Sequence, residues 1–194
     1  MNIRTVYVAA PLLMLAYGGI RIIDGFDGTY GPGLAWTTGH LAFIAALVLF
    51  AAIFRDMWQR LGRTWPATTG MVLGFTGIAC LLAQFTIDIA IGFMAADRAA
   101  MGTLFDQVQA VPGVQLAVYD VGPFLFYVAQ LALVVHLAVR RQVKAWIPVA
   151  LLAGLMLPMV DKDLIPVSAL FLLGLFWLLA PRTAPAAQHT LARA

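Results

Sequence analysis

Six long apolar stretches cover most of this 194-residue chain. Most approach the roughly 20 residues that an α-helix needs to cross the hydrocarbon core of a bilayer. They are too continuously apolar for the alternating strands of a membrane barrel. The sequence therefore predicts an all-α fold, a polytopic membrane helix bundle with six transmembrane helices. The six stretches are Thr5–Ile23, Leu34–Phe54, Ala67–Ala95, Tyr119–Val139, Ala145–Val160 and Leu164–Ala180.

Composition agrees with this class, because only 11% of the residues are charged, against about a quarter in soluble domains. The fifth and sixth stretches are short, and Pro148, Pro158 and Pro166 fall within them. A re-entrant hairpin stays open there, with five spans as the alternative to six. At the N-terminus, residues 1–18 resemble a signal peptide. The apolar run continues to Ile23, which favours an uncleaved first helix.

The basic residues are distributed unequally between the two sides of these stretches. Nine of the twelve Lys and Arg residues fall on one side, and most of the nine acidic residues fall on the other. Because an excess of Lys and Arg marks cytoplasmic loops, both termini are predicted to be cytoplasmic. The net charge of +3 then reflects topology, and no nucleic-acid partner is expected. The nine residues are Arg4, Arg55, Arg60, Arg63, Arg140, Arg141, Lys144, Arg182 and Arg193.

The chain is predicted to form one membrane domain, residues 1–181, followed by a disordered cytoplasmic tail, residues 182–194. Asp24–Gly33 is a glycine-rich outer loop. Arg98–Val111 has apolar residues at helical spacing and predicts a short amphipathic helix on the outer surface, capped by Asp97. It serves either as a linker or as a lid over a pocket. The Ala-, Arg- and Leu-rich composition indicates a bacterial inner membrane as the location.

Polar residues collect in the outer half of the predicted bundle. An ionisable group near the bilayer centre costs at least ~2.5–3.5 kcal/mol, so such residues are expected to face the interior and to have partners. The residues are Tyr17, Arg21 and Asp24 in or beside the first span, His40 in the second, Gln84 and Asp88 in the third, and Asp120, Tyr127 and Gln130 in the fourth. The aromatic residues Trp36, Phe85 and Phe124 are predicted at the same depth.

This cluster has two interpretations. It is structural if Arg21 simply pairs with Asp88 or Asp120 and so ties the helices together. It is a functional pocket if an acid remains without a cationic partner. Desolvation favours the protonated form of such a carboxyl, and a protonated carboxyl is a natural general acid.

Several other chemistries lack their residues. Cys80 is the single cysteine, which excludes an intrachain disulfide or a thiol pair. His40 and His136 are predicted at opposite ends of the bundle and cannot ligate one iron. No metal site or cofactor is therefore expected.

The favoured hypothesis is a small membrane enzyme, a cyclase or isomerase that protonates a lipid or isoprenoid as a terpene cyclase does. Asp88 or Asp120 would be the acid, His40 the proton partner and Arg21 the electrostatic tuner. The substrate would contact Tyr17, Asp24, Trp36, Gln84, Phe85, Phe124, Tyr127 and Gln130. Membrane lipids are expected to surround the protein.

Two alternatives of another class stay open. Gly70, Gly74 and Gly77 recur at helical spacing on the third span and could admit a partner helix. This favours an accessory or assembly subunit, or a homo-oligomer, although the same glycines could pack the monomer. A small transporter is the other alternative, with Asp88 and Asp120 binding a cation or proton.

Overall fold

The computed structural model describes residues 2–26 and 30–181, and within these residues every regular element is helical. The α-helices are α1 (Ile3–Asp24), α2 (Leu34–Arg60), α3 (Trp65–Met94), α4 (Arg98–Gln109), α5 (Gly122–Val139), α6 (Trp146–Val160) and α7 (Ile165–Leu179). A π-helical segment, η1 (Gln115–Val121), leads into α5, and a 3₁₀ turn, η2 (Lys162–Leu164), leads into α7. The predicted disordered tail, residues 182–194, lies outside the described residues.

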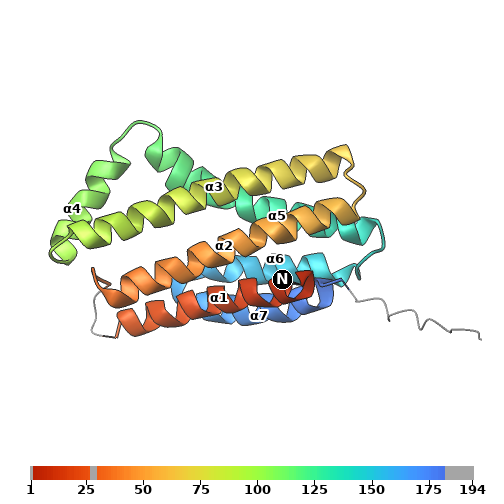
Figure 1. The fold of residues 1–194 in the computed structure, drawn as a ribbon, viewed down its shortest axis with the longest axis horizontal. Coiled ribbons are helices and arrows are strands. Elements are labelled where there is room, and N and C mark those ends of the chain that lie inside the picture. Colours follow the sequence, from red (N-terminus) through yellow and green to blue (C-terminus); the bar gives the residue numbers. More distant parts are fainter. Residues whose placement is uncertain (1, 27–29, 182–194) are drawn as a thin grey trace, which may run out of the picture.

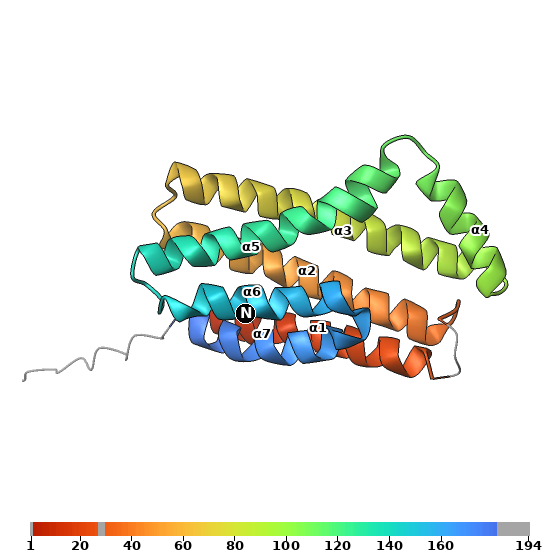
Figure 2. The ribbon, with the colours of Figure 1, turned by 180° about the vertical axis from the view of Figure 1, so that it is seen from behind.

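All the α-helices except α4 lie side by side along the long axis of the molecule (Figures 1 and 2). The helix α1 packs against α2 and α7, while α3 packs against α2 and α5, and α6 against α5 and α7. We call the end that carries α4 the α4 end; α1, α3 and α6 finish there. The other end, where α1 begins, is the opposite end.

Five helical segments of the described chain are long and apolar enough to cross a membrane. They are Ile3–Asp24, Leu34–Arg60, Trp65–Met94, Gln115–Val139 and Lys162–Leu179. The predicted multi-pass membrane helix bundle is confirmed at this level. The helix α6 has 15 residues. At 1.5 Å per residue it is roughly 22 Å long, shorter than a typical hydrocarbon core.

The prolines in the last two apolar stretches lie near helix ends rather than in helix centres. Pro148 and Pro166 occupy the first turns of α6 and α7, where a missing N–H costs least, and Pro158 lies in the last turn of α6. The helix predicted over Arg98–Val111 is α4, and the Asp97 carboxylate accepts from Ala100 N at 2.9 Å as its cap. Its place on the outer surface stays a prediction.

The helices α3 and α5 approach closely because glycines line their contact. A Cβ atom at Gly77 would overlap the backbone nitrogen of Phe126. A Cβ at Gly74 would overlap the Phe54 ring, and one at Gly70 would lie 3.1 Å from Leu133. All three glycines of the predicted stripe are therefore used inside this chain.

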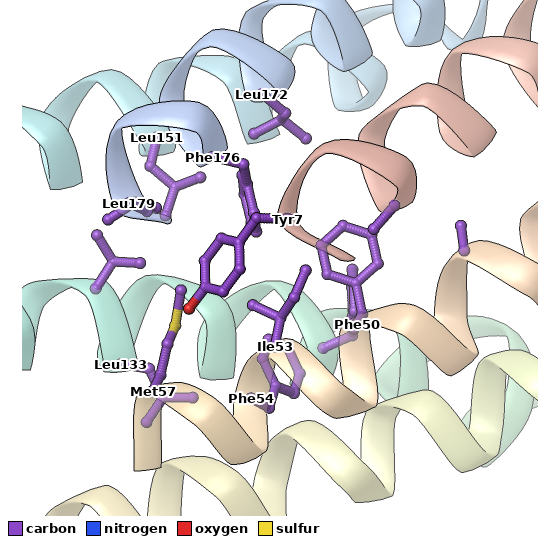
Figure 3. Close-up of a cluster of buried hydrophobic side chains, with 14 of the residues drawn as sticks. Tyr7, Phe50, Ile53, Phe54, Met57, Leu133, Leu151, Leu172, Phe176 and Leu179 are labelled. Carbon is purple, nitrogen blue, oxygen red and sulfur yellow. The ribbon is translucent and has the colours of Figure 1, made fainter. Parts of the chain in front are cut away.

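A large apolar core fills the bundle toward the opposite end (Figure 3). Tyr7 lies in this core beside Phe176, with ring centroids 5.9 Å apart, and is fully buried. Its hydroxyl donates to the Asp56 carboxylate at 2.8 Å. Arg60 lies 3.8 Å from the same carboxylate and donates to the Leu179 carbonyl at 2.8 Å. This tie joins α1, α2 and the end of α7.

We expect Gly77→Ala to destabilise the bundle, because the new methyl group must push α5 away from α3. Overpacking of this kind costs about 1–3 kcal/mol. SDS-induced unfolding in mixed micelles measures the change. Gly174→Ala on α7 is the matched control, since a Cβ there meets nothing within 4 Å. Equal stability of the two variants would contradict the close α3–α5 contact.

Candidate functional site

A buried histidine and a buried aspartate face each other at the α4 end. His40 comes from the second turn of α2 and Asp88 from the last two turns of α3. The two residues are only 5% and 7% exposed, and His40 Nε2 lies 3.5 Å from Asp88 Oδ2. The Tyr119 hydroxyl, from η1, donates to Asp88 Oδ1 at 3.1 Å. Both carboxylate oxygens therefore have a partner on another helix.

The hydrogen bonds of His40 determine where a proton can lie. Nδ1 of His40 is 2.7 Å from the carbonyl oxygen of Trp36. A carbonyl only accepts, so Nδ1 must carry a hydrogen, which leaves Nε2 to face Asp88. Nε2 and the Asp88 carboxylate therefore face each other at 3.5 Å, which is close enough for a proton to pass between the two side chains.

Aromatic rings enclose the imidazole of His40. The ring centroids of Trp36, Phe85 and Tyr17 lie 4.2, 5.0 and 5.8 Å from that of His40. Phe43 stacks on Phe85 at 4.4 Å and supports it from behind. We call Tyr17, Trp36, Phe43 and Phe85 the aromatic cage. Aromatic faces attract cations, so the cage suits an imidazolium or another positive charge beside it.

A small cavity of about 20 Å³ adjoins the cage. Its wall includes His40, Tyr17 and Trp36, together with the charged residues Arg21 and Asp24 of α1. A space of this size holds about one water molecule. Its polar wall suits the reacting end of a substrate, and its volume is too small for a lipid chain.

Tyr30, which precedes α2, connects the wall of this cavity to α4 and η2. Tyr30 lines the cavity, and the Arg21 guanidinium lies 4.2 Å from the centre of the Tyr30 ring. Asp163 of η2 accepts from the Tyr30 hydroxyl at 3.2 Å and lies 3.7 Å from Arg21. Arg98, the first residue of α4, donates to the Tyr30 carbonyl. Phe105 of α4 packs on Trp36, with ring centroids 6.3 Å apart.

Comparison of this chain with protein-family models, with curated proteins and with solved structures finds no match. Its function must therefore be argued from the chemistry of its own side chains. Within the described residues, no group of three or more His, Cys, Asp or Glu side chains is placed to share a metal ion. The His40–Asp88 pair is the arrangement with the clearest capacity for proton transfer.

An apolar groove of about 400 Å³ lies on the other side of Trp36. Its wall includes Leu34 and Phe93, which are 81% and 74% exposed, and Gly92. A Cβ atom at Gly92 would lie 2.6 Å from the Trp36 ring, so the ring rests directly on this glycine. The indole nitrogen of Trp36 also donates to the Asp88 carbonyl at 2.8 Å. Trp36 therefore lines the cavity and contacts Gly92 in the wall of the groove.

The structure brings together most, but not all, of the residues that the sequence singled out. His40, Asp88, Trp36, Tyr17 and Phe85 form one cluster, with Arg21 and Asp24 in the wall of its cavity. The cation Arg21 pairs with Asp163 instead of the two candidate acids.

Asp120 lies apart from this cluster. It is exposed, and its carboxylate accepts from Gln115 at 3.0 Å. Phe124 is 56% exposed, and Tyr127 packs against Phe126 and the core. The Gln130 side chain is fully buried. Neither of its amide atoms, nor Oε1 of Gln84, has a hydrogen-bond partner within residues 2–26 and 30–181.

Four residues of the site were not among the predicted catalytic or substrate-binding residues: Tyr119, Tyr30, Arg98 and Asp163. On the fourth span, α-helical spacing placed Asp120 on one stripe with Tyr127 and Gln130. The π-helical turn of η1 has i→i+5 hydrogen bonds and changes which residue faces inward. Tyr30 and Asp163 lie in turns, whose contacts have no periodic signal in the sequence.

We expect His40 and Asp88 to be energetically coupled. In a double-mutant cycle of His40→Leu and Asp88→Leu, the double variant should be more stable than the sum of the single changes predicts. Residues in one buried network couple by about 0.5–3 kcal/mol. Unfolding of the four proteins in mixed micelles measures this coupling energy. Gln115 and Asp120 are the control, because their hydrogen bond is exposed to water and should couple them more weakly. Additive effects at His40 and Asp88 would contradict a direct interaction between the two side chains.

Proposed function

We propose that this protein is a small integral membrane enzyme that uses the His40–Asp88 pair as an acid on a lipid or isoprenoid substrate. The observation that carries the proposal is this pair, buried and facing each other at 3.5 Å, beside an aromatic cage. Asp88 is the acid and His40 its proton partner, while Tyr119 fixes the second carboxylate oxygen. Asp120, exposed and bonded to Gln115, has no part in it.

The chemistry is an isomerisation or cyclisation. With an alkene, Asp88 gives its proton to one carbon, and the electrons of the π bond form the new C–H bond. With an epoxide, Asp88 gives its proton to the oxygen, and the C–O bond breaks with its electrons leaving on oxygen. The resulting carbocation is attacked by a second double bond or loses a proton directly. Loss of a proton to the pair restores the acid. For an alkene, the product has the formula of the substrate, so no cofactor is required.

Access to the site follows from the position of Trp36. The cavity of about 20 Å³ admits only the reacting end of a molecule, whereas the groove of about 400 Å³ is in the range of small-molecule sites. An apolar chain lying in the groove reaches the pair when the Trp36 ring leaves its place on Gly92. The exposed Leu34 and Phe93 place the entrance of the groove toward lipid.

We also propose six membrane crossings, with α4 outside and both termini in the cytoplasm of a bacterium. The cations on Arg4, Arg55, Arg60, Arg63, Arg140, Arg141 and Lys144 all belong to segments at the opposite end. Trp65, Trp146 and Trp177 also lie at this end, at 80%, 49% and 53% exposure. Arg4 stacks on Trp177, 4.5 Å from its ring centre. Basic residues together with exposed tryptophans are typical of a cytoplasmic interface.

Labelling with a membrane-impermeant maleimide tests this topology. In a Cys80→Ser background, Thr103→Cys on α4 should be labelled in intact cells, because it lies outside. Arg140→Cys, exposed after α5, should be labelled only after the membrane is permeabilised. The reverse pattern would contradict the proposed orientation, and labelling of both would contradict the odd number of crossings between them.

Incubation in deuterium oxide tests the reaction. The purified protein in lipid nanodiscs should convert a member of a panel of linear isoprenoid alkenes and their epoxides into an isomer. Each alkene product should carry one new C–D bond, detected by mass spectrometry, because the acid exchanges with solvent. We expect Asp88→Asn to lower the rate at least ~100-fold, the usual scale of general acid catalysis.

The matched control is Asp120→Asn, the same change at an exposed site, which should leave the rate unaltered. Circular dichroism must show equal helix content in the two variants. Undiminished turnover in Asp88→Asn, products without deuterium, or no conversion of any panel member by the unmodified protein would contradict the proposal.

A further inference from the structure

A basic groove of about 560 Å³ lies at the opposite end of the bundle, whereas the His40–Asp88 pair lies at the α4 end. Its wall is formed by the end of α2, the connection from α5 to α6, and the end of α7. Arg60, Arg141 and Lys144 line it, and no acidic residue does. The proposed acid chemistry makes no use of this groove.

The walls of the groove are held in place by hydrogen bonds. The Gln142 side chain donates to the Arg60 carbonyl at 2.9 Å and fixes the connection after α5 to the end of α2. Arg60 donates to the Leu179 carbonyl and fixes α7 to the same place. The groove is therefore formed in the absence of any ligand.

Two of the three cations are available to bind an anion. Arg60 already has Asp56 at 3.8 Å. Within residues 2–26 and 30–181, the side chains of Arg141 and Lys144 have no hydrogen-bond or ion-pair partner. The φ angle of Arg141 is 56° because this residue ends α5, where Gln142 N donates to the Leu137 carbonyl.

Apart from the three cations and Gln142, the side chains that line the groove are apolar. Ile147 and Leu178 line the groove beside the cations, and Trp146 lies at its edge, half exposed. A free inorganic anion would leave this surface unused. A phospholipid uses both parts, because its phosphate meets the cations while its acyl chain lies on the apolar side. Basic pockets between membrane helices on the cytoplasmic side bind lipid head groups in this way.

We propose that this groove is a binding site for one anionic phospholipid of the surrounding leaflet. Its phosphate lies between Arg141 and Lys144, with Arg60 as the anchored third cation. The acyl chain follows Ile147 and Leu178 into the bilayer. This site is separate from the acid pair, so it holds whether or not the proposed reaction is correct.

Native mass spectrometry tests the site. The purified full-length protein is given equal amounts of phosphatidylglycerol and phosphatidylcholine, and the lipid adducts that survive detergent removal are counted. We expect the unmodified protein to retain phosphatidylglycerol selectively. Each cation removed should weaken binding about fivefold, so Arg141→Gln with Lys144→Gln should weaken it roughly 30-fold.

Arg140→Gln is the matched control, because it removes the same charge from the neighbouring position without lining the groove. It should retain phosphatidylglycerol as the unmodified protein does, and Arg141→Lys should retain most binding. Thermal unfolding without added lipid should be the same for all variants. Equal loss in Arg140→Gln, unaltered binding in the double variant, or displacement of the lipid by an equal concentration of inorganic phosphate would overturn the proposal.

Discussion

The constraint on which this structure depends is that a carboxylate within an apolar bundle must find its partners on other side chains of the chain. Two carboxylates satisfy it in the same way. Asp56 accepts from Tyr7 and faces Arg60, while Asp88 accepts from Tyr119 and faces His40. Each set joins helices that are distant in the sequence. Between them the bundle is filled by apolar side chains, so each end holds its own polar centre.

The difference between the two centres lies in the basic partner. The guanidinium of Arg60 stays protonated at any physiological pH, so its attraction to Asp56 is permanent and suits a structural tie. Asp88 instead faces an imidazole, the side chain that proteins most often use to transfer protons, so the same geometry there suits proton transfer. Within the described residues, aromatic rings enclose the basic partner at this second centre. This contrast is the physical reason for placing chemistry at the α4 end and structural support at the other.

Periodicity explains what the sequence could predict. The apolar runs locate the membrane helices, and Asp97 locates the start of α4, because these signals repeat along one helix or cap its end. His40 and Asp88 were found because an ionisable residue is rare inside an apolar run. Asp120 was misplaced relative to them, since the π-helical turn of η1 turns Tyr119 inward instead. The Tyr7–Asp56 bond was missed because Asp56 and Arg60, four residues apart, read as an ordinary surface pair on one helix.

Trp36 connects the parts of the candidate site more than any other residue does. Its carbonyl fixes the tautomer of His40, its indole nitrogen holds the backbone at Asp88, and its ring contacts Gly92 in the wall of the groove. A ring displaced by a substrate chain therefore also loses its bond to the Asp88 carbonyl. In the proposed enzyme, the same motion that admits the substrate would loosen the acid pair and bring it into contact with the alkene.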